Sequence, residues 1–457
     1  MPSRPRAPWP LVALFTAGYL ASYLLPTVVG RLSAGLGLSP SEAGLVGSTL
    51  LLCSATAGFT LAARVERYGP RRLARAGLAL AVAGYGGAAL TSYVPLVVAG
   101  AAVGGFGSGT ALAVAAAGIA GRPDPHRTST LGLLSVSATA GALYLTLPHL
   151  GGGHVLPFAS LALAAAAVWP ATARLETGHD TGEVREKGAP LPRLRAGVVL
   201  AGAMVCWSMA QNALWGVSGR IGLTQAGLSE VTVGAVFAAA LGAGLLGVTT
   251  AGALGSRLGR AVPIGLGTVA IAGCIALSSS AEGLASFATG EILWNACYPV
   301  VLSYVIGLAA SLDPRGRWAV LVGSASSLGT ACGPVTGSLL SEQAGYPAMG
   351  LVLGGLLLLL AVPMTAVALH TSGRPLVPGA IRRRGGAPAA VVAATAAPTA
   401  LAPQIGAPEQ PVAEIPVADL ADLRGPAAAT RRAYGLAEST ASADSGEPKS
   451  YASTSAR

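Results

Sequence analysis

The chain alternates between long apolar stretches and short polar breaks. Charged residues make up 11% of it and its mean hydropathy is +0.62, whereas soluble domains carry about 25% charged residues. Each apolar stretch has roughly the 20 residues that a helix needs to cross a bilayer. The pattern predicts an all-α membrane protein with twelve transmembrane helices, near residues 10–30, 43–63, 73–91, 95–121, 129–147, 154–173, 197–217, 230–254, 262–280, 284–309, 318–340 and 347–369.

Basic residues gather on one side of the predicted membrane. If the N-terminus is cytoplasmic, the segments on that side up to Arg384 hold 22 Lys and Arg residues, and the external loops hold only Arg31 and Arg220. Because cytoplasmic loops carry an excess of Lys and Arg, we expect both termini in the cytoplasm and the protein in the plasma membrane. This distribution accounts for the net charge of +10 without a nucleic-acid partner. The excess of Arg over Lys, with abundant Ala and Gly, suggests a GC-rich bacterial genome.

A polar break at residues 174–196 divides the apolar stretches six and six. We expect an N-terminal six-helix bundle at 1–173, a cytoplasmic linker loop at 174–196 and a C-terminal six-helix bundle at 197–370. Residues 371–457 are rich in Ala, Pro, Ser and Thr, which predicts a disordered cytoplasmic tail.

The two halves repeat each other at an offset of about 189 residues. Parallel six-helix repeats place a binding cavity between them, near the middle of the membrane. Four pairs of short motifs occupy matching positions: Gly30-Arg31 and Gly219-Arg220, Ser41-Glu42 and Ser229-Glu230, Arg67-Tyr68-Gly69 and Arg257-Leu258-Gly259, Asp124-Pro125 and Asp313-Pro314.

The loop at 62–72 resembles the signature Gly-x-x-x-Asp-Arg-x-Gly-Arg-Arg of the major facilitator superfamily, and 254–260 resembles its weaker second copy. Ala62 stands for the usual Gly, Glu66 for the Asp, and Pro70 is an extra residue. The resemblance covers about residues 10–370 and implies two six-helix bundles that rock about a central site. It also implies a conformational latch made of Glu66, Arg67, Gly69, Arg71, Arg72, Arg257 and Gly259.

Two further family signatures are altered. The fourth-helix pattern Arg-x-x-Gln-Gly aligns with 101–105, where both the Arg and the Gln are missing, and its repeat partner 190 residues later is Glu291. The antiporter pattern Gly-Pro-x-x-Gly is absent from 135–141. A similar run at 333–337 is interpreted as a packing and bending element.

Glu291 lies well inside the apolar stretch 284–309, as no other Asp, Glu, Lys or His does in any stretch. It shares one helix face with Trp294, Asn295 and Tyr298. Acidic side chains inside a membrane are costly and usually functional, so we interpret Glu291 as the proton-coupling group. The alternative is a protonated carboxyl that serves packing alone.

The resemblance implies that the first, fourth, seventh and tenth helices line the cavity. Aromatic faces beside a few polar groups suit a moderately apolar ligand, although packing or an interfacial belt would also explain the aromatic residues. The candidate cavity residues are Trp294, Asn295, Tyr298, Trp207, Gln211, Asn212, Tyr19 and Tyr23.

These features favour a secondary transporter of small organic molecules, most simply a proton-coupled exporter that works by alternating access as a monomer. Uptake of a metabolite, a membrane-embedded enzyme and a transport-dead sensor are the alternatives. The histidines and cysteines are scattered without metal-type spacing, and no phosphate-binding glycine loop is present, so we expect no enzyme activity, metal or cofactor. The expected partners are a small-molecule substrate, protons and the lipid bilayer.

Overall fold

The computed structural model describes residues 8–122, 124–151, 153–175, 191–254, 259–313 and 316–372. These residues form helices joined by short connections, and no strand occurs among them. The predicted linker falls mostly outside the described residues, as does the predicted tail from residue 373 onward. The boundaries proposed for the two bundles therefore remain predictions.

The N-terminal half begins with a broken span. Together α1 and α2 are long and apolar enough to cross a membrane, and a bend of 49° separates them. A short connection of η1 and α4 joins α3 to α5, and η2 and η3 follow α7 and α8. The bounds are α1 Trp9–Tyr23, α2 Leu25–Leu36, α3 Pro40–Leu61, η1 Ala62–Arg64, α4 Val65–Tyr68, α5 Pro70–Leu90, α6 Val94–Ala120, α7 Pro125–Thr146, η2 Leu147–His149, α8 Val155–Val168 and η3 Trp169–Arg174.

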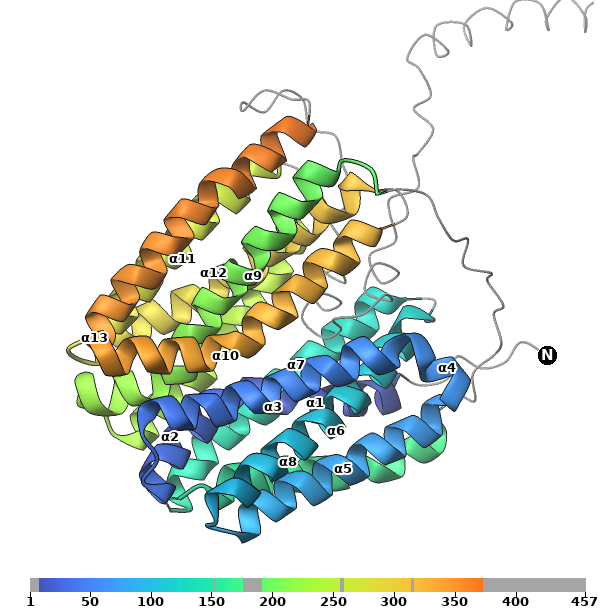
Figure 1. Cartoon of the computed structure of the whole chain (residues 1–457), viewed down its shortest axis with the longest axis vertical. Helices are drawn as coiled ribbons and strands as arrows, with labels where there is room; N and C mark the ends of the chain where they lie inside the picture. The colour runs from blue at the N-terminus through green and yellow to red at the C-terminus, as the bar shows by residue number, and fades with distance from the viewer. Residues whose placement is uncertain are drawn as a thin grey trace, which may run out of the picture. The chain divides into compact units, whose positions relative to one another are not determined.

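The C-terminal half ends in α13, a helix of 56 residues that Gly345 breaks with non-helical backbone angles (φ 79°, ψ 165°). Figure 1 shows the two arms of α13, which are two spans. Among the described residues, ten helices are long and apolar enough to cross a membrane, and the bent pair is an eleventh; dividing α13 gives twelve. The twelve-span prediction is confirmed. The bounds are α9 Leu194–Arg220, η4 Ile221–Gln225, α10 Glu230–Leu254, α11 Ala261–Ser279, α12 Leu284–Leu312 and α13 Arg317–Ser372.

Helix starts follow the local chemistry of the sequence. Ser39 caps α3 in a reciprocal capping box with Glu42, and Asp124 caps α7 by accepting a hydrogen bond from the Arg127 N–H at 3.0 Å. Both satisfy amide groups that the first turn of a helix leaves unpaired. The capping hydroxyl of α3 thus belongs to Ser39, and the hydroxyl of Ser41 bonds Glu342 of α13.

The two halves meet through α3 with α13, α7 with α10 and α2 with α9. These contacts lie at one end of the helices, where α3 and α10 begin and α7 and α9 end. The backbone amide of Val335 donates to the Ser48 hydroxyl there at 3.0 Å. A Cβ added to Gly234 of α10 would collide with the Tyr144 carbonyl oxygen of α7. The halves are therefore packed closely at this end.

Candidate functional site

A cavity of about 170 Å³ lies between the two halves. Aromatic rings and small hydroxyl or amide groups provide its polar and flat surfaces, and no charged side chain is among the described residues that line it. The aromatic and polar lining residues are Tyr19, Ser22, Tyr23, Ser54, Ser137, Asn212, Trp215, Trp294, Asn295, Tyr298, Ser326, Ser327 and Thr330. Such a cavity suits an uncharged ligand with a flat or apolar part and a few hydrogen-bonding groups.

The cavity lies on the other side of the helices from the packed end. On α3 the lining runs from Leu51 to Gly58, beyond the contact at Ser48. On α10 it runs from Leu241 to Val248, beyond Gly234. The cavity therefore extends from mid-helix toward the end with the basic loops, while the other end is closed.

Six of the eight candidate cavity residues line this space: Tyr19, Tyr23, Asn212, Trp294, Asn295 and Tyr298. The other two, Trp207 and Gln211, are fully buried behind it. The Trp207 ring stacks on Tyr298 with centroids 5.4 Å apart and planes 16° apart. The Gln211 Oε1 accepts a hydrogen bond from Trp294 Nε1 at 2.9 Å. Both residues thus orient aromatic rings that face the cavity.

The sequence did not single out most of the small hydroxyl residues of the cavity wall. Serine and threonine in a membrane helix commonly bond the carbonyl one turn earlier, as Ser327 does with Gly323 at 3.2 Å. A serine or threonine in the sequence of a membrane helix therefore does not by itself indicate a position in the cavity wall. Only the fold shows that Ser208 and Ser326 bond each other at 2.8 Å from different helices.

Glu291 is fully buried in α12 and does not line the cavity. It lies one turn before Trp294 and Asn295, and the Asn295 Nδ2 donates to its backbone carbonyl at 3.0 Å. The carboxyl is thus next to the cavity wall and shielded from the cavity itself.

Two serine hydroxyls hold one oxygen of this carboxyl. Glu291 Oε1 lies 2.8 Å from the Ser218 hydroxyl of α9 and 2.6 Å from the Ser278 hydroxyl of α11. The second oxygen, Oε2, is buried without a hydrogen-bond partner among the described residues, and none of them forms an ion pair with Glu291. The site therefore has two neutral donors and no fixed positive charge.

The Ser218 hydroxyl can adapt to the presence of a proton. Its oxygen also lies 3.0 Å from the Leu214 carbonyl oxygen, and a hydroxyl has one hydrogen to donate. When Glu291 is ionised, Ser218 can donate to it. When Glu291 carries a proton on Oε1, Ser218 can accept that proton's hydrogen bond and donate to Leu214. Both protonation states are accommodated by rotation of one hydroxyl.

The described residues of the predicted latch lie where α4 meets α5 and just before α11, at the other end of the helices from the packed end. Gly69 and Gly259 both have left-handed backbone angles (φ 82° and 65°), which explains why each copy of the motif needs a glycine. Arg67 and Arg72 are exposed, and Arg71 is half-buried with an Nε that has no partner among the described residues. Arg257 and the side chain of Glu66 lie outside the described residues, so the latch stays a prediction.

Comparisons with known proteins agree with this architecture. The family model of the Major Facilitator Superfamily matches residues 11–314. The structure of the human organic anion transporter MFSD10 (TETRAN) is similar with a TM-score of 0.57 and 16% sequence identity, over 80% of this chain and 100% of that one. The inward-open xylose transporter XylE from E. coli gives a TM-score of 0.60 and 14% identity, over 78% and 94%.

No curated protein matches this sequence. The family model nevertheless covers more than half of the chain, and both similar structures have the fold that the sequence predicts. At such low identity the similar structures establish the fold alone. The chain therefore belongs to the major facilitator superfamily, and it is a multi-pass membrane protein that carries small molecules by secondary transport.

Proposed function

We propose that this protein exports uncharged amphipathic small molecules across the plasma membrane in exchange for protons, acting as a monomer with both termini in the cytoplasm. The observation that carries the proposal is the buried Glu291 carboxyl, held by the Ser218 and Ser278 hydroxyls beside the cavity wall. It supplies a group that can take up and release a proton beside the cavity between the two halves.

Proton binding suits Glu291 better than a structural role. A buried carboxylate that only packs would be expected to pair with a cation or to fill its hydrogen bonds. Here Oε2 has no partner among the described residues, and Ser218 can serve both protonation states. Trp294 lies one turn away on the same face and contributes to the cavity, so proton occupancy can influence substrate binding without direct contact.

The cavity determines the proposed substrate class. A carboxylate or phosphate ligand needs a cationic or strongly donating partner once it leaves water, and no Arg or Lys is among the described lining residues. An organic anion, as named for the human structure, therefore fits poorly. Flat rings and hydroxyl or amide groups fit the side chains of Trp215, Trp294 and Asn295 better.

The predicted orientation supports export. With the basic loops in the cytoplasm, the cavity faces the cytoplasm, where it can take up amphipathic compounds that have entered the cell. Rocking of the halves would then close that side, and we assign the closure to the latch residues Glu66, Arg67, Gly69, Arg71, Arg72, Arg257 and Gly259.

Inverted membrane vesicles with an acidic interior test the proposal. A panel of neutral amphipathic compounds is added, and a dye that senses the pH difference is followed. A compound that collapses the gradient only when this protein is present supports proton exchange. Glu291→Gln should abolish the response, because an amide cannot release a proton. The matched control is Glu282→Gln, an exposed carboxyl just before the same helix. Normal coupled transport by Glu291→Gln would contradict the proposal.

Uptake of a neutral polar metabolite is a second candidate, and the small hydroxyl and amide groups of Ser137, Asn212 and Thr330 favour it. The two directions give opposite results in a paired experiment. An exporter concentrates the compound inside inverted vesicles with an acidic lumen, whereas a proton-driven importer concentrates it in right-side-out vesicles placed in acidic medium.

A further inference from the structure

Besides the hydrogen bond between Val335 and Ser48, two polar contacts that involve a charged side chain join the halves at the packed end of the molecule. The first is an ion pair of 3.0 Å between Arg31 of α2 and Glu230 at the start of α10. In the second, the Ser41 hydroxyl and backbone amide of α3 donate to Glu342 of α13. Both contacts span from residues of the first repeat to residues of the second.

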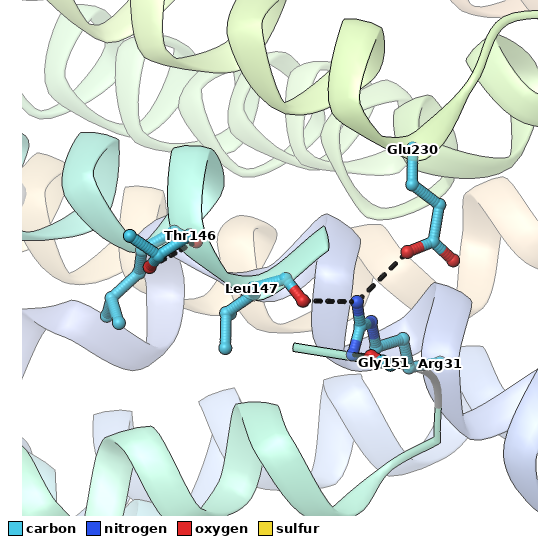
Figure 2. A network of polar contacts seen from close by, with 6 residues as sticks. Arg31, Thr146, Leu147, Gly151 and Glu230 are labelled. Carbon is cyan, nitrogen blue, oxygen red and sulfur yellow. Dashed lines mark hydrogen bonds and ion pairs between the residues drawn. The ribbon is translucent and has the colours of Figure 1, made fainter. Parts of the chain in front are cut away.

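Arg31 is held firmly in its own half. Its guanidinium donates to the carbonyl oxygens of Gly151 at 2.5 Å and Leu147 at 3.0 Å, just after α7 ends. Figure 2 shows the side chain bridging from Leu147 to Glu230. The Arg31 side chain is 7% exposed and that of Glu230 is 45% exposed. The arginine is therefore a fixed, buried donor, and the glutamate is the partner that can withdraw.

The internal repeat offers a second ion pair with which the Arg31–Glu230 pair can be compared. Arg31 corresponds to Arg220, and Glu230 corresponds to Glu42. If the halves met symmetrically, Arg220 would pair with Glu42. Instead Arg220 bonds Ser341 of its own half at 3.4 Å, and Glu42 accepts from the Ser39 amide of its own helix at 2.8 Å. The closed end is thus held by one of two possible ion pairs.

We propose that the Arg31–Glu230 ion pair is the outer gate of this transporter, a reversible bond that holds the external side closed while the cavity faces the cytoplasm. The inference rests on the predicted orientation of the chain and not on proton coupling by Glu291. Opening to the outside separates α2 from α10, so Glu230 moves into water while Arg31 keeps its two carbonyl partners. The pair therefore sets the balance between the two facing states without contacting the substrate.

Thiol labelling of a cavity residue tests the gate. Ser327→Cys places a thiol in the cavity wall, in a background where the five native cysteines are replaced. A membrane-impermeant maleimide is applied to right-side-out and to inverted vesicles. The parent should react quickly from the cytoplasmic side and slowly from outside. Arg31→Gln and Glu230→Gln should each raise the external rate by about five-fold, the equivalent of about 1 kcal/mol for a half-exposed pair.

The Arg31→Gln, Glu230→Gln double variant should react no faster than the faster single variant, because removing one partner already breaks the bond. The matched control is Glu42→Gln, which changes the repeat-related carboxylate that accepts a hydrogen bond from Ser39 of its own half, and it should not change the rate. Size-exclusion profiles identify variants that fail to fold.

A second measurement does not depend on removing charge. Ser41→Cys with Glu342→Cys should form a disulfide under mild oxidation, hold the outer side closed, and stop external labelling until a reductant is added. Unchanged external rates in both single variants would overturn the gate, as would an equal rise in Glu42→Gln. Parent labelling from outside alone would show that the closed side is cytoplasmic, which also overturns an outer gate.

Discussion

In the N-terminal half, α3 packs against α6, and the glycines of this contact lie on α6. The corresponding contact of the C-terminal half joins α10 to α12, and its glycine lies on α10. A Cβ on Gly105 or Gly109 of α6 would collide with the carbonyl oxygens of Leu50 or Ser54 of α3. In the other half, a Cβ on Gly247 of α10 would collide with the Ala296 carbonyl oxygen of α12.

The position of the glycine decides which of the two helices can present large side chains to the cavity. Small residues let two membrane helices approach closely, and the helix that supplies them gives up side chains along that face. Because α10 supplies the glycine, α12 is free to carry Trp294, Asn295 and Tyr298 toward the cavity. The repeat-related helix α6 contributes only Gly109 and Leu112 there. Repeat-related helices thus serve packing in one half and the site in the other.

The largest expected effect comes from placing a carboxyl in the wrong half. Ala101 of α6 corresponds to Glu291 and is fully buried, but the repeat counterparts of Ser218 and Ser278 are Val29 and Ala89, which offer no hydroxyl. Ala101→Glu should cost several kcal/mol, because a buried polar group without partners is penalised.

The measurement is the yield and melting temperature of purified protein. Ala101→Ser is the control, since a serine can bond its own helix. Normal yield of Ala101→Glu would show that the N-terminal half tolerates a buried carboxyl without such hydroxyls.

The next effect comes from the glycine contact of the C-terminal half. Gly247→Val should destabilise the protein by about 1–3 kcal/mol, because the added atoms overpack the contact with α12. Gly242→Val on the same helix is the control, since a Cβ there meets nothing within 4 Å. Thermal unfolding in detergent compares the two variants. Equal melting temperatures would show that the close contact of α10 with α12 does not depend on Gly247.

Loss of one hydroxyl at the carboxyl should have an effect of similar size. Ser278→Ala removes the 2.6 Å hydrogen bond to Glu291, which should cost about 1–3 kcal/mol because the acceptor is charged or buried, and proton exchange should slow. Ser280→Ala, whose hydroxyl bonds only its own helix at Ala276, is the control. Proton flux in vesicles and melting temperature are measured together, and a variant indistinguishable from the control would show that Ser278 does not support the site.

The smallest expected effect tests the N-terminal contribution to binding. Ser137→Ala removes one hydroxyl from the cavity wall and should weaken the binding of an identified substrate by about 0.5–1.5 kcal/mol. Thr139→Val, two residues away and outside the lining, should leave affinity unchanged. Equal affinity of Ser137→Ala and the parent would show that the Ser137 hydroxyl does not bind the substrate.

The fold could be predicted from the sequence because its signals are local. The length of each apolar stretch, the basic loops and the repeated motifs each depend on neighbours within a few residues, and together they predicted the twelve helices and the family. Glu291 stood out for the same reason, since a carboxylate in an apolar run is costly wherever the neighbouring helices lie.

The partners of these residues could not be predicted in this way. Whether Gln211 faces the cavity or supports Trp294, and whether Ser41 caps its helix or bonds Glu342, depends on which helices pack together. The same holds for the hydroxyls at Glu291 and for the pairing of Arg31 with Glu230, whose residues are 199 apart in sequence. The sequence determined how many helices cross the membrane and where the costly charge lies. Only the tertiary structure decided which side chains meet, because hydrogen bonds form between groups that the packing of distant helices brings within about 3 Å.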